Sequence, residues 1–173
     1  GLGERLIRPE EVRGGSATMA EAVAERGWPT LASTRGRFLA VLHDHGALRQ
    51  ALANTDWDGE APALFVDGGG ELDLPSAAFH VLNDPGDPRI AEALARGALV
   101  RTRADSGTAE ARANDPTRAQ AAWASGAHLV STDFLLPHPD TGYQVRTPGG
   151  TPSRCNPRVA PKACAAEAIE DPS

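Results

Sequence analysis

The chain has 173 residues, of which 40% are hydrophobic and 23% are charged, as in an ordinary globular domain with its own core. Its formal net charge of −6 argues against a nucleic-acid partner, because nucleic-acid affinity depends on a basic surface. No run of about 18 apolar residues is present, so we expect no transmembrane segment and at most a peripheral membrane contact.

The first third of the chain predicts a helix, a strand and a second helix. Residues 1–15 are polar, and we expect no regular structure there. Thr18 and Glu21 have the spacing of a capping box, which predicts that a helix begins at this point. The apolar run over residues 38–43 predicts a buried strand, and residues 47–53 predict the helix that follows it.

The middle of the chain repeats this alternation. Residues 63–66 predict a second strand, and residues 77–82 are a candidate third strand. Pro88 favours the first position of a helix, which we expect to run to Arg96. A further strand is predicted over residues 98–104.

The last regular elements predicted are a helix over residues 115–125, which Gly126 ends, and a strand over residues 128–133. Strands that alternate with helices indicate βαβ units and a parallel sheet. Four strands and a candidate fifth are about half of a TIM-type (β/α)8 barrel. A Rossmann-like sheet is the competing architecture, but no G-x-G-x-x-G motif follows any predicted strand.

Polar side chains gather at the ends of the last two predicted strands. The period of a strand places Arg101, Arg103 and Asp105 on one face of the first of them. Asp133 ends the second strand, and the same period places it on one face with Leu129 and Ser131. Polar groups at C-terminal strand ends are typical of the active-site mouth of an α/β barrel.

These four side chains are candidates for contact with a ligand. Arg101 and Arg103 can each offer a planar fork of donors to a phosphate. Asp105 and Asp133 can accept hydrogen bonds from ligand hydroxyl groups, and Asp133 is our preferred partner for orienting an arginine. The alternative is a salt-bridge network that only holds the strands together.

Two histidines flank Asp44 after the first predicted strand. A His-x-His pair can bind a metal, but the sequence around His43 and His45 supplies no third ligand. We therefore predict no metal site in this chain, and we place His43 with the substrate-binding residues at the barrel mouth. Of the tryptophans, we expect Trp28 and Trp123 to pack internally and Trp57 to be exposed.

The cysteines, Cys155 and Cys164, fit no four-ligand zinc pattern. A short disulfide that closes a proline-rich loop is the preferred interpretation, and two unpaired thiols are the alternative. The loop-entropy model gives such a disulfide about 2–3 kcal/mol. A disulfide also indicates an oxidising compartment, which predicts a secreted or periplasmic protein.

Two long segments carry a family resemblance: Leu99-Val-Arg-Thr-Arg-Ala-Asp-Ser-Gly-Thr108 and Ala124-Ser-Gly-Ala-His-Leu-Val-Ser-Thr-Asp133. They resemble the calcium-dependent phosphoinositide-specific phospholipase C family, which belongs to the phosphatidylinositol phosphodiesterase barrel superfamily. Residues 3–13, 27–31 and 154–157 are similar to the same family.

The resemblance implies the C-terminal half of the family's barrel, with residues 1–137 as the half barrel and residues 138–173 as a coil-rich tail that holds the disulfide. In this superfamily the catalytic histidines and most acidic metal ligands come from the N-terminal half. The resemblance therefore implies a phosphoric diester hydrolase that acts on phosphoinositides by histidine acid/base catalysis. The histidines and the calcium ligands would lie outside this chain, which alone would be inactive. The alternative function is a non-catalytic phosphate- or carbohydrate-binding barrel.

Overall fold

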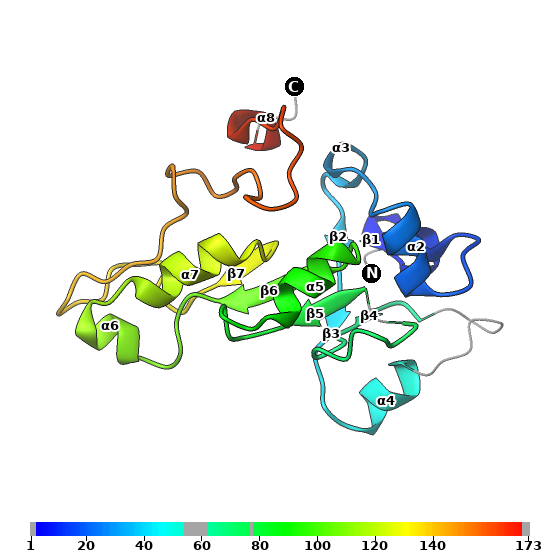
Figure 1. Cartoon of the computed structure of the whole chain (residues 1–173), viewed down its shortest axis with the longest axis horizontal. Coiled ribbons are helices and arrows are strands. Elements are labelled where there is room, and N and C mark those ends of the chain that lie inside the picture. Colours follow the sequence, from blue (N-terminus) through cyan, green and yellow to red (C-terminus); the bar gives the residue numbers. More distant parts are fainter. Residues whose placement is uncertain (1–2, 54–61, 77, 171–173) are drawn as a thin grey trace. The chain divides into compact units, whose positions relative to one another are not determined.

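The structure is a computed structural model that describes residues 3–53, 62–76 and 78–170 (Figure 1). It forms two compact units. The first unit comprises Gly1–Val81 and Ala95–Leu99, and the second comprises Leu82–Leu94 and Val100–Ser173. Trp57, which we expected to be exposed, lies outside the described residues.

Residues 3–13 form regular elements, so our expectation of irregular structure over residues 1–15 is wrong. They form the 3-10 helix η1 (Gly3–Arg5), the strand β1 (Leu6–Ile7) and the helix α1 (Pro9–Arg13). These elements are too short to show a hydrophobic period. Tertiary packing holds them, since Ile7 and Val12 are buried in the core of the first unit.

The helix predicted from Thr18 is present as α2 (Met19–Glu25), and its capping box is confirmed. The Thr18 hydroxyl accepts a hydrogen bond from the Glu21 N–H at 3.0 Å, and the Glu21 carboxylate accepts one from the Thr18 N–H at 3.1 Å. Met19 and Val23 then fall on one helix face and are buried. A short helix α3 (Leu31–Thr34) follows.

All strand pairs of the first unit with a defined register are parallel. Its remaining elements are β2 (Phe38–Leu39), β3 (Val41–Leu42), α4 (Ala47–Ala53), β4 (Phe65–Val66) and β5 (Phe79–Val81). Leu6 pairs with Phe38, and Val41 pairs with Phe65. The strand predicted over residues 38–43 is thus present as β2 and β3, and the helix over 47–53 is confirmed. The expected burial of this strand is wrong, because Phe38 is 48% exposed and the other residues of β2 and β3 are only partly buried. Ala77, the first residue of the candidate third strand, lies outside the described residues.

The later elements fall wholly or mostly in the second unit. They are α5 (Arg89–Ala95), β6 (Leu99–Arg103), α6 (Ala109–Ala113), α7 (Thr117–Ser125), β7 (Leu129–Ser131) and α8 (Ala166–Glu170). The strands β6 and β7 are parallel, with Arg101 opposite Leu129 and Arg103 opposite Ser131. Their sheet has the strand order β5-β6-β7. The predicted α/β class with parallel strands is therefore confirmed, in agreement with a partial barrel.

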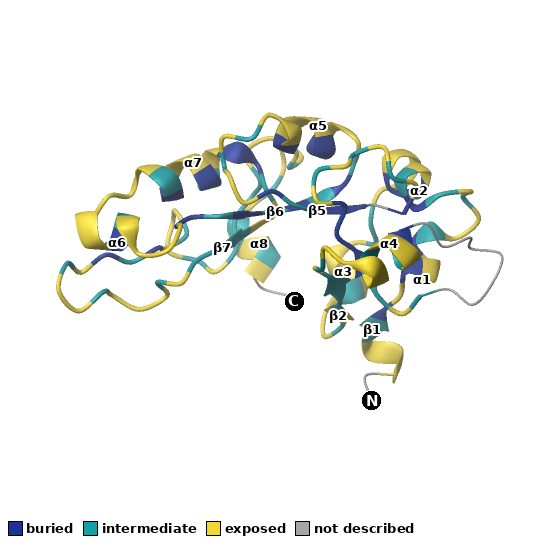
Figure 2. Ribbon diagram, turned by 90° about the horizontal axis from the view of Figure 1, so that it is seen from below, coloured by how far each residue is buried: buried dark blue, intermediate teal, exposed yellow. Residues whose placement is uncertain are grey.

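The predicted alternation along β6 is also confirmed (Figure 2). Val100 and Thr102 are fully buried, whereas Arg101 and Arg103 are only partly buried. After the strand, Ala104 joins an alanine-rich core with α6 and α7. Trp123 packs against this core, as predicted.

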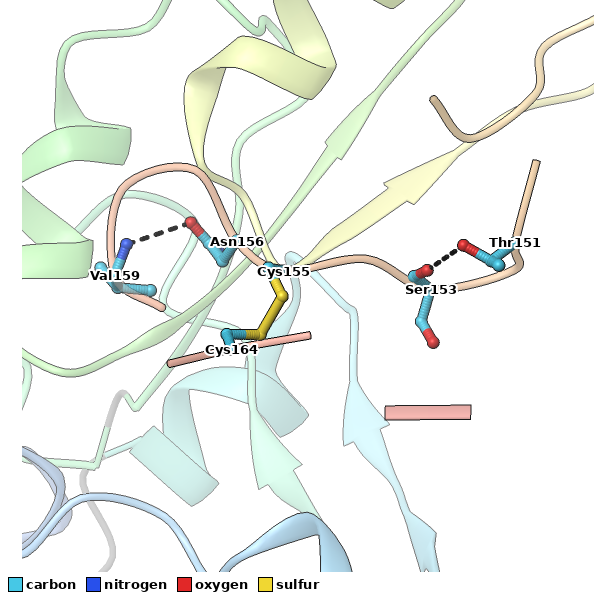
Figure 3. The surroundings of a disulfide bond; sticks show 6 residues. All are labelled: Thr151, Ser153, Cys155, Asn156, Val159 and Cys164. Atoms are coloured by element: carbon cyan, nitrogen blue, oxygen red, sulfur yellow. Dashed lines mark hydrogen bonds between the residues drawn. A yellow bond between two sulfur atoms is a disulfide. The ribbon is translucent and has the colours of Figure 1, made fainter. Parts of the chain in front are cut away.

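The tail contains the predicted disulfide between Cys155 and Cys164, with their Cα atoms 5.9 Å apart (Figure 3). Asn156 fixes the loop, because its side-chain oxygen accepts the Val159 N–H at 3.3 Å and its side-chain nitrogen donates to the Gly126 carbonyl at 2.7 Å. The tail also forms α8, which we did not predict. None of the helices in the described ranges is long and apolar enough to cross a membrane.

Candidate functional site

Asp105 joins the C-terminal ends of β6 and β7. It lies two residues after the end of β6 and is 0% exposed. Its carboxylate accepts hydrogen bonds from the Thr132 hydroxyl and, at 3.2 Å, from the Asp133 N–H. A buried carboxylate is stable only when donors of this kind replace water. Asp105 is therefore the anchor of the site. The strand period places it on the face of Arg101 and Arg103, but unlike these two partly exposed side chains it is fully buried.

Arg103 lies between two carboxylates. Its Nη2 donates to Asp133 at 2.6 Å and lies 3.4 Å from Asp105. Over the described ranges, its Nε and Nη1 atoms have no hydrogen-bond partner. The side chain of Arg103 is 29% exposed and that of Asp133 is 61% exposed. Three of the predicted site residues are thus in direct contact, and the arginine keeps donors that neither aspartate uses.

Arg101 takes part in a different contact. Its Nη1 donates to the side-chain oxygen of Asn83 at 2.6 Å, and Arg118 donates to the backbone carbonyl of Asn83 at 2.6 Å. Sequence reasoning missed Asn83, which lies two residues after the end of β5. Its position shortly after a predicted strand could have indicated it, because polar residues at C-terminal strand ends are typical of the mouth of an α/β barrel.

Sequence reasoning also missed Tyr143, which belongs to the core cluster that contains Ala104. It is buried, and its ring packs edge-on against Phe134 with ring centroids 5.4 Å apart. Among the described residues its hydroxyl has no hydrogen-bond partner. Burial raises the pKa of Tyr143, and the negative charges of Asp105 and Glu110 raise it further. Tyr143 falls in the tail that we expected to be coil, so no periodic signal marked it.

The raised pKa of Tyr143 predicts a titration that can be followed without a probe, because the chain contains one tyrosine. The folded state favours the protonated phenol, so this contribution to stability is complete below the unfolded pKa, about 10. It is lost as the pH rises through the folded pKa. We expect the tyrosinate absorbance of the folded chain to develop at higher pH than that of the urea-unfolded chain.

The control for this titration is Glu110→Gln, which removes one of the nearby negative charges and should move the midpoint toward the unfolded value. Near-ultraviolet circular dichroism at each pH shows that the chain is still folded. A folded midpoint equal to or below the unfolded one would contradict the prediction.

His43, the fifth predicted site residue, lies in the first unit. Its Nδ1 is 2.7 Å from a carboxylate oxygen of Asp67. Its ring packs edge-on against the ring of His45, with ring centroids 5.3 Å apart. Asp67 follows β4 directly and is 1% exposed. Sequence reasoning missed Asp67, although its position at a strand end carries the same signal as Asp105 and Asp133.

The side chains of the described ranges do not fit a calcium ion. In residues 3–53, 62–76 and 78–170, no group of three or more histidine, cysteine, aspartate and glutamate side chains is arranged to hold a metal. Calcium prefers six or more oxygen ligands.

Comparison with known proteins places this geometry in a family. The family model described as phosphoinositide phospholipase C, Ca2+-dependent, matches residues 2–157. Among solved structures, the chain is similar to a Ca2+-dependent phosphatidylinositol-specific phospholipase C enzyme from Streptomyces antibioticus, with a TM-score of 0.51 and 20% sequence identity. That likeness, which shows the fold, covers 76% of this chain and 54% of that chain, so this chain spans about half the length of the relative. The comparison with curated proteins gave no match. Because the family model covers most of its length, the chain belongs to the calcium-dependent phosphoinositide phospholipase C family.

Proposed function

We propose that this chain is part of a phosphoric diester hydrolase that cleaves phosphoinositides or related phosphodiesters. Family membership supports the reaction class. The observation that carries the proposal is Arg103, a partly exposed arginine at the C-terminal end of β6 that two aspartates hold in place. Ligands of α/β barrels bind at this end of the strands.

In this proposal the two aspartates have different roles. Asp105 is fully buried and keeps its contacts when a ligand binds, so it compensates the charge of Arg103 within the fold. Asp133 is largely exposed, and a phosphate that approaches Arg103 displaces it. Nη1 of Arg103, and the Nη2 that Asp133 has released, then bind two phosphate oxygens, while Asp133 accepts a hydrogen bond from a hydroxyl of the head group.

The residues that break the phosphodiester bond belong, in this proposal, to a segment outside this chain. The similar structure is almost twice as long as the part that this chain matches, which supports that division. The histidines would transfer protons to and from the attacking and leaving oxygens. Residues 1–137 would form the half barrel, and the calcium ligands would come from the same outside segment as the histidines. The disulfide supports a secreted or periplasmic protein.

Two leucines next to the site suit a lipid-bound substrate. Leu135 and Leu136 follow Asp133 by two and three residues and are highly exposed. Their loop is ordered, because Gln144 donates to the Leu135 carbonyl at 2.6 Å and Val145 donates to the Phe134 carbonyl at 3.1 Å. In this proposal the leucines contact the lipid surface peripherally, and their burial there stabilises the bound state.

Calorimetric titration of the chain with an inositol phosphate tests the proposal. We expect saturable binding that Arg103→Ala weakens about tenfold to hundredfold, because a charge-assisted hydrogen bond contributes about 1.5–3 kcal/mol. Arg112→Ala is the matched control. It removes the same charge from α6, where the Nε of Arg112 donates to the Thr108 hydroxyl at 2.7 Å.

Equal loss of binding in the two variants, or no binding to the unmodified chain, would overturn the role of Arg103. Hydrolysis of phosphatidylinositol is measured in parallel. We expect no turnover by this chain alone, and turnover would overturn the assignment of the catalytic histidines to an outside segment.

A further inference from the structure

We propose that Asp67 holds His43 in the tautomer that carries its proton on Nδ1, so that Nε2 is a proton acceptor open to solvent. The pair would then be a second chemically active site of the chain, able to take a proton from water or an alcohol. This inference rests on the first unit alone and does not depend on the phosphodiesterase proposal.

The Asp67 carboxylate has a fixed orientation. Its Oδ1 accepts hydrogen bonds from the Gly69 N–H at 2.7 Å and the Val81 N–H at 2.8 Å. The peptide after it is also held, since Arg49 donates to the carbonyls of Asp67 and Gly68 at 2.8 Å each. Oδ1 is therefore occupied by two backbone donors, and Oδ2 is the oxygen that meets His43.

The contact with Oδ2 selects the tautomer of His43. An ionised carboxylate can only accept a hydrogen bond, so the Nδ1 of His43, 2.7 Å away, must donate. In neutral imidazole the other nitrogen, Nε2, is then unprotonated and basic. A carboxylate that orients a histidine in this way is the arrangement by which hydrolases prepare a general base.

Exposure separates the two partners. The side chain of Asp67 is 1% exposed, whereas that of His43 is 47% exposed. The buried partner is thus the orienting group, and the partly exposed ring can meet a ligand.

The proton acceptor, Nε2 of His43, indicates the class of reaction, which is ester hydrolysis or transfer. As the oxygen of water or an alcohol bonds to an ester carbon, Nε2 takes the proton of that oxygen, and the alkoxide or phenolate of the ester leaves. The proton on Nε2 then returns to the leaving group or to solvent. Nitrophenyl acetate, a small ester with a good leaving group, is the probe for this reaction.

The first test is the tautomer of His43 in the unmodified chain, measured by nitrogen-15 nuclear magnetic resonance near neutral pH. The signal is assigned by its loss in His43→Asn. We expect the pattern of a proton on Nδ1. A proton on Nε2 would overturn the proposal, and this measurement needs no variant of Asp67.

The second test is Asp67→Asn, in which the amide oxygen can keep the two backbone donors and the amide nitrogen then faces His43. That nitrogen donates to Nδ1 and forces the proton of His43 onto Nε2. We expect the tautomer to reverse and nitrophenyl acetate hydrolysis to fall at least about tenfold, as loss of a general base requires. His45→Gln is the matched control and should keep both the tautomer and the rate.

An unchanged rate in Asp67→Asn, or equal losses in Asp67→Asn and His45→Gln, would overturn the proposal. Thermal unfolding of each variant accompanies the rates. If Asp67→Asn does not fold, the tautomer of the unmodified chain decides the question.

Discussion

Replacing Asp105 by alanine is expected to lower the free energy of unfolding of the second unit by about 3 kcal/mol. The substitution removes a fully buried carboxylate and leaves the Thr132 hydroxyl and the Asp133 N–H without the acceptor that they use in the fold. Each buried donor left unpaired costs about 1–3 kcal/mol. Urea unfolding followed by near-ultraviolet circular dichroism measures the change, because Tyr143 packs in this unit.

Asp133→Ala is the matched control, since it removes the other carboxylate that contacts Arg103. Asp133 is 61% exposed, and an exposed ion pair contributes less than about 1 kcal/mol. Equal effects of the two substitutions would contradict the assignment of Asp105 as the anchor. The expected difference also makes Asp133 the carboxylate that a ligand can displace without unfolding the site.

The strand β6 shows how far the sequence alone predicts this fold. Its alternation of apolar and polar residues is long enough to assign a strand and to place Val100 and Arg101 on opposite faces. The strand β1 has two residues, and α6 and α8 have five each, so none of them shows a period. Their existence depends on packing against segments that are distant in the sequence, which a local pattern does not contain.

The candidate site, too, could be predicted only in part from the sequence. Arg103, Asp105 and Asp133 were predicted because parallel strands bring their C-terminal ends to one edge. The partner of His43 was not predicted, because Asp67 is 24 residues away and the contact depends on how the end of β4 turns. Tyr143 was missed for a similar reason, since it is buried in a cluster with residues of α6, α7 and the tail that follows β7.

The role of each aspartate also required the structure. The sequence places Asp105 and Asp133 at equivalent strand ends, yet one is fully buried and the other is largely exposed. Burial separates the carboxylate that holds the fold from the one that can meet a ligand. The two substitutions above measure that separation directly.

Gly97→Ala is expected to destabilise the first unit by about 3–4 kcal/mol. Gly97 has φ +77°, a left-handed conformation that costs an alanine about 1–2 kcal/mol. An added Cβ would also lie 2.4 Å from the backbone carbonyl oxygen of Val23 in α2. The segment cannot shift freely, because the Trp28 indole donates to the Gly97 carbonyl at 3.1 Å.

Gly27→Ala separates the two causes. Gly27 has φ +71°, and its added Cβ would meet no atom within 4 Å, so only the conformational cost of about 1–2 kcal/mol applies. Hydrogen exchange of the α2 amides measures both variants in the same unit. A larger loss of protection in Gly97→Ala than in Gly27→Ala supports close backbone packing between Gly97 and α2. Equal losses would contradict it, and the left-handed conformation alone would then account for the glycine at position 97.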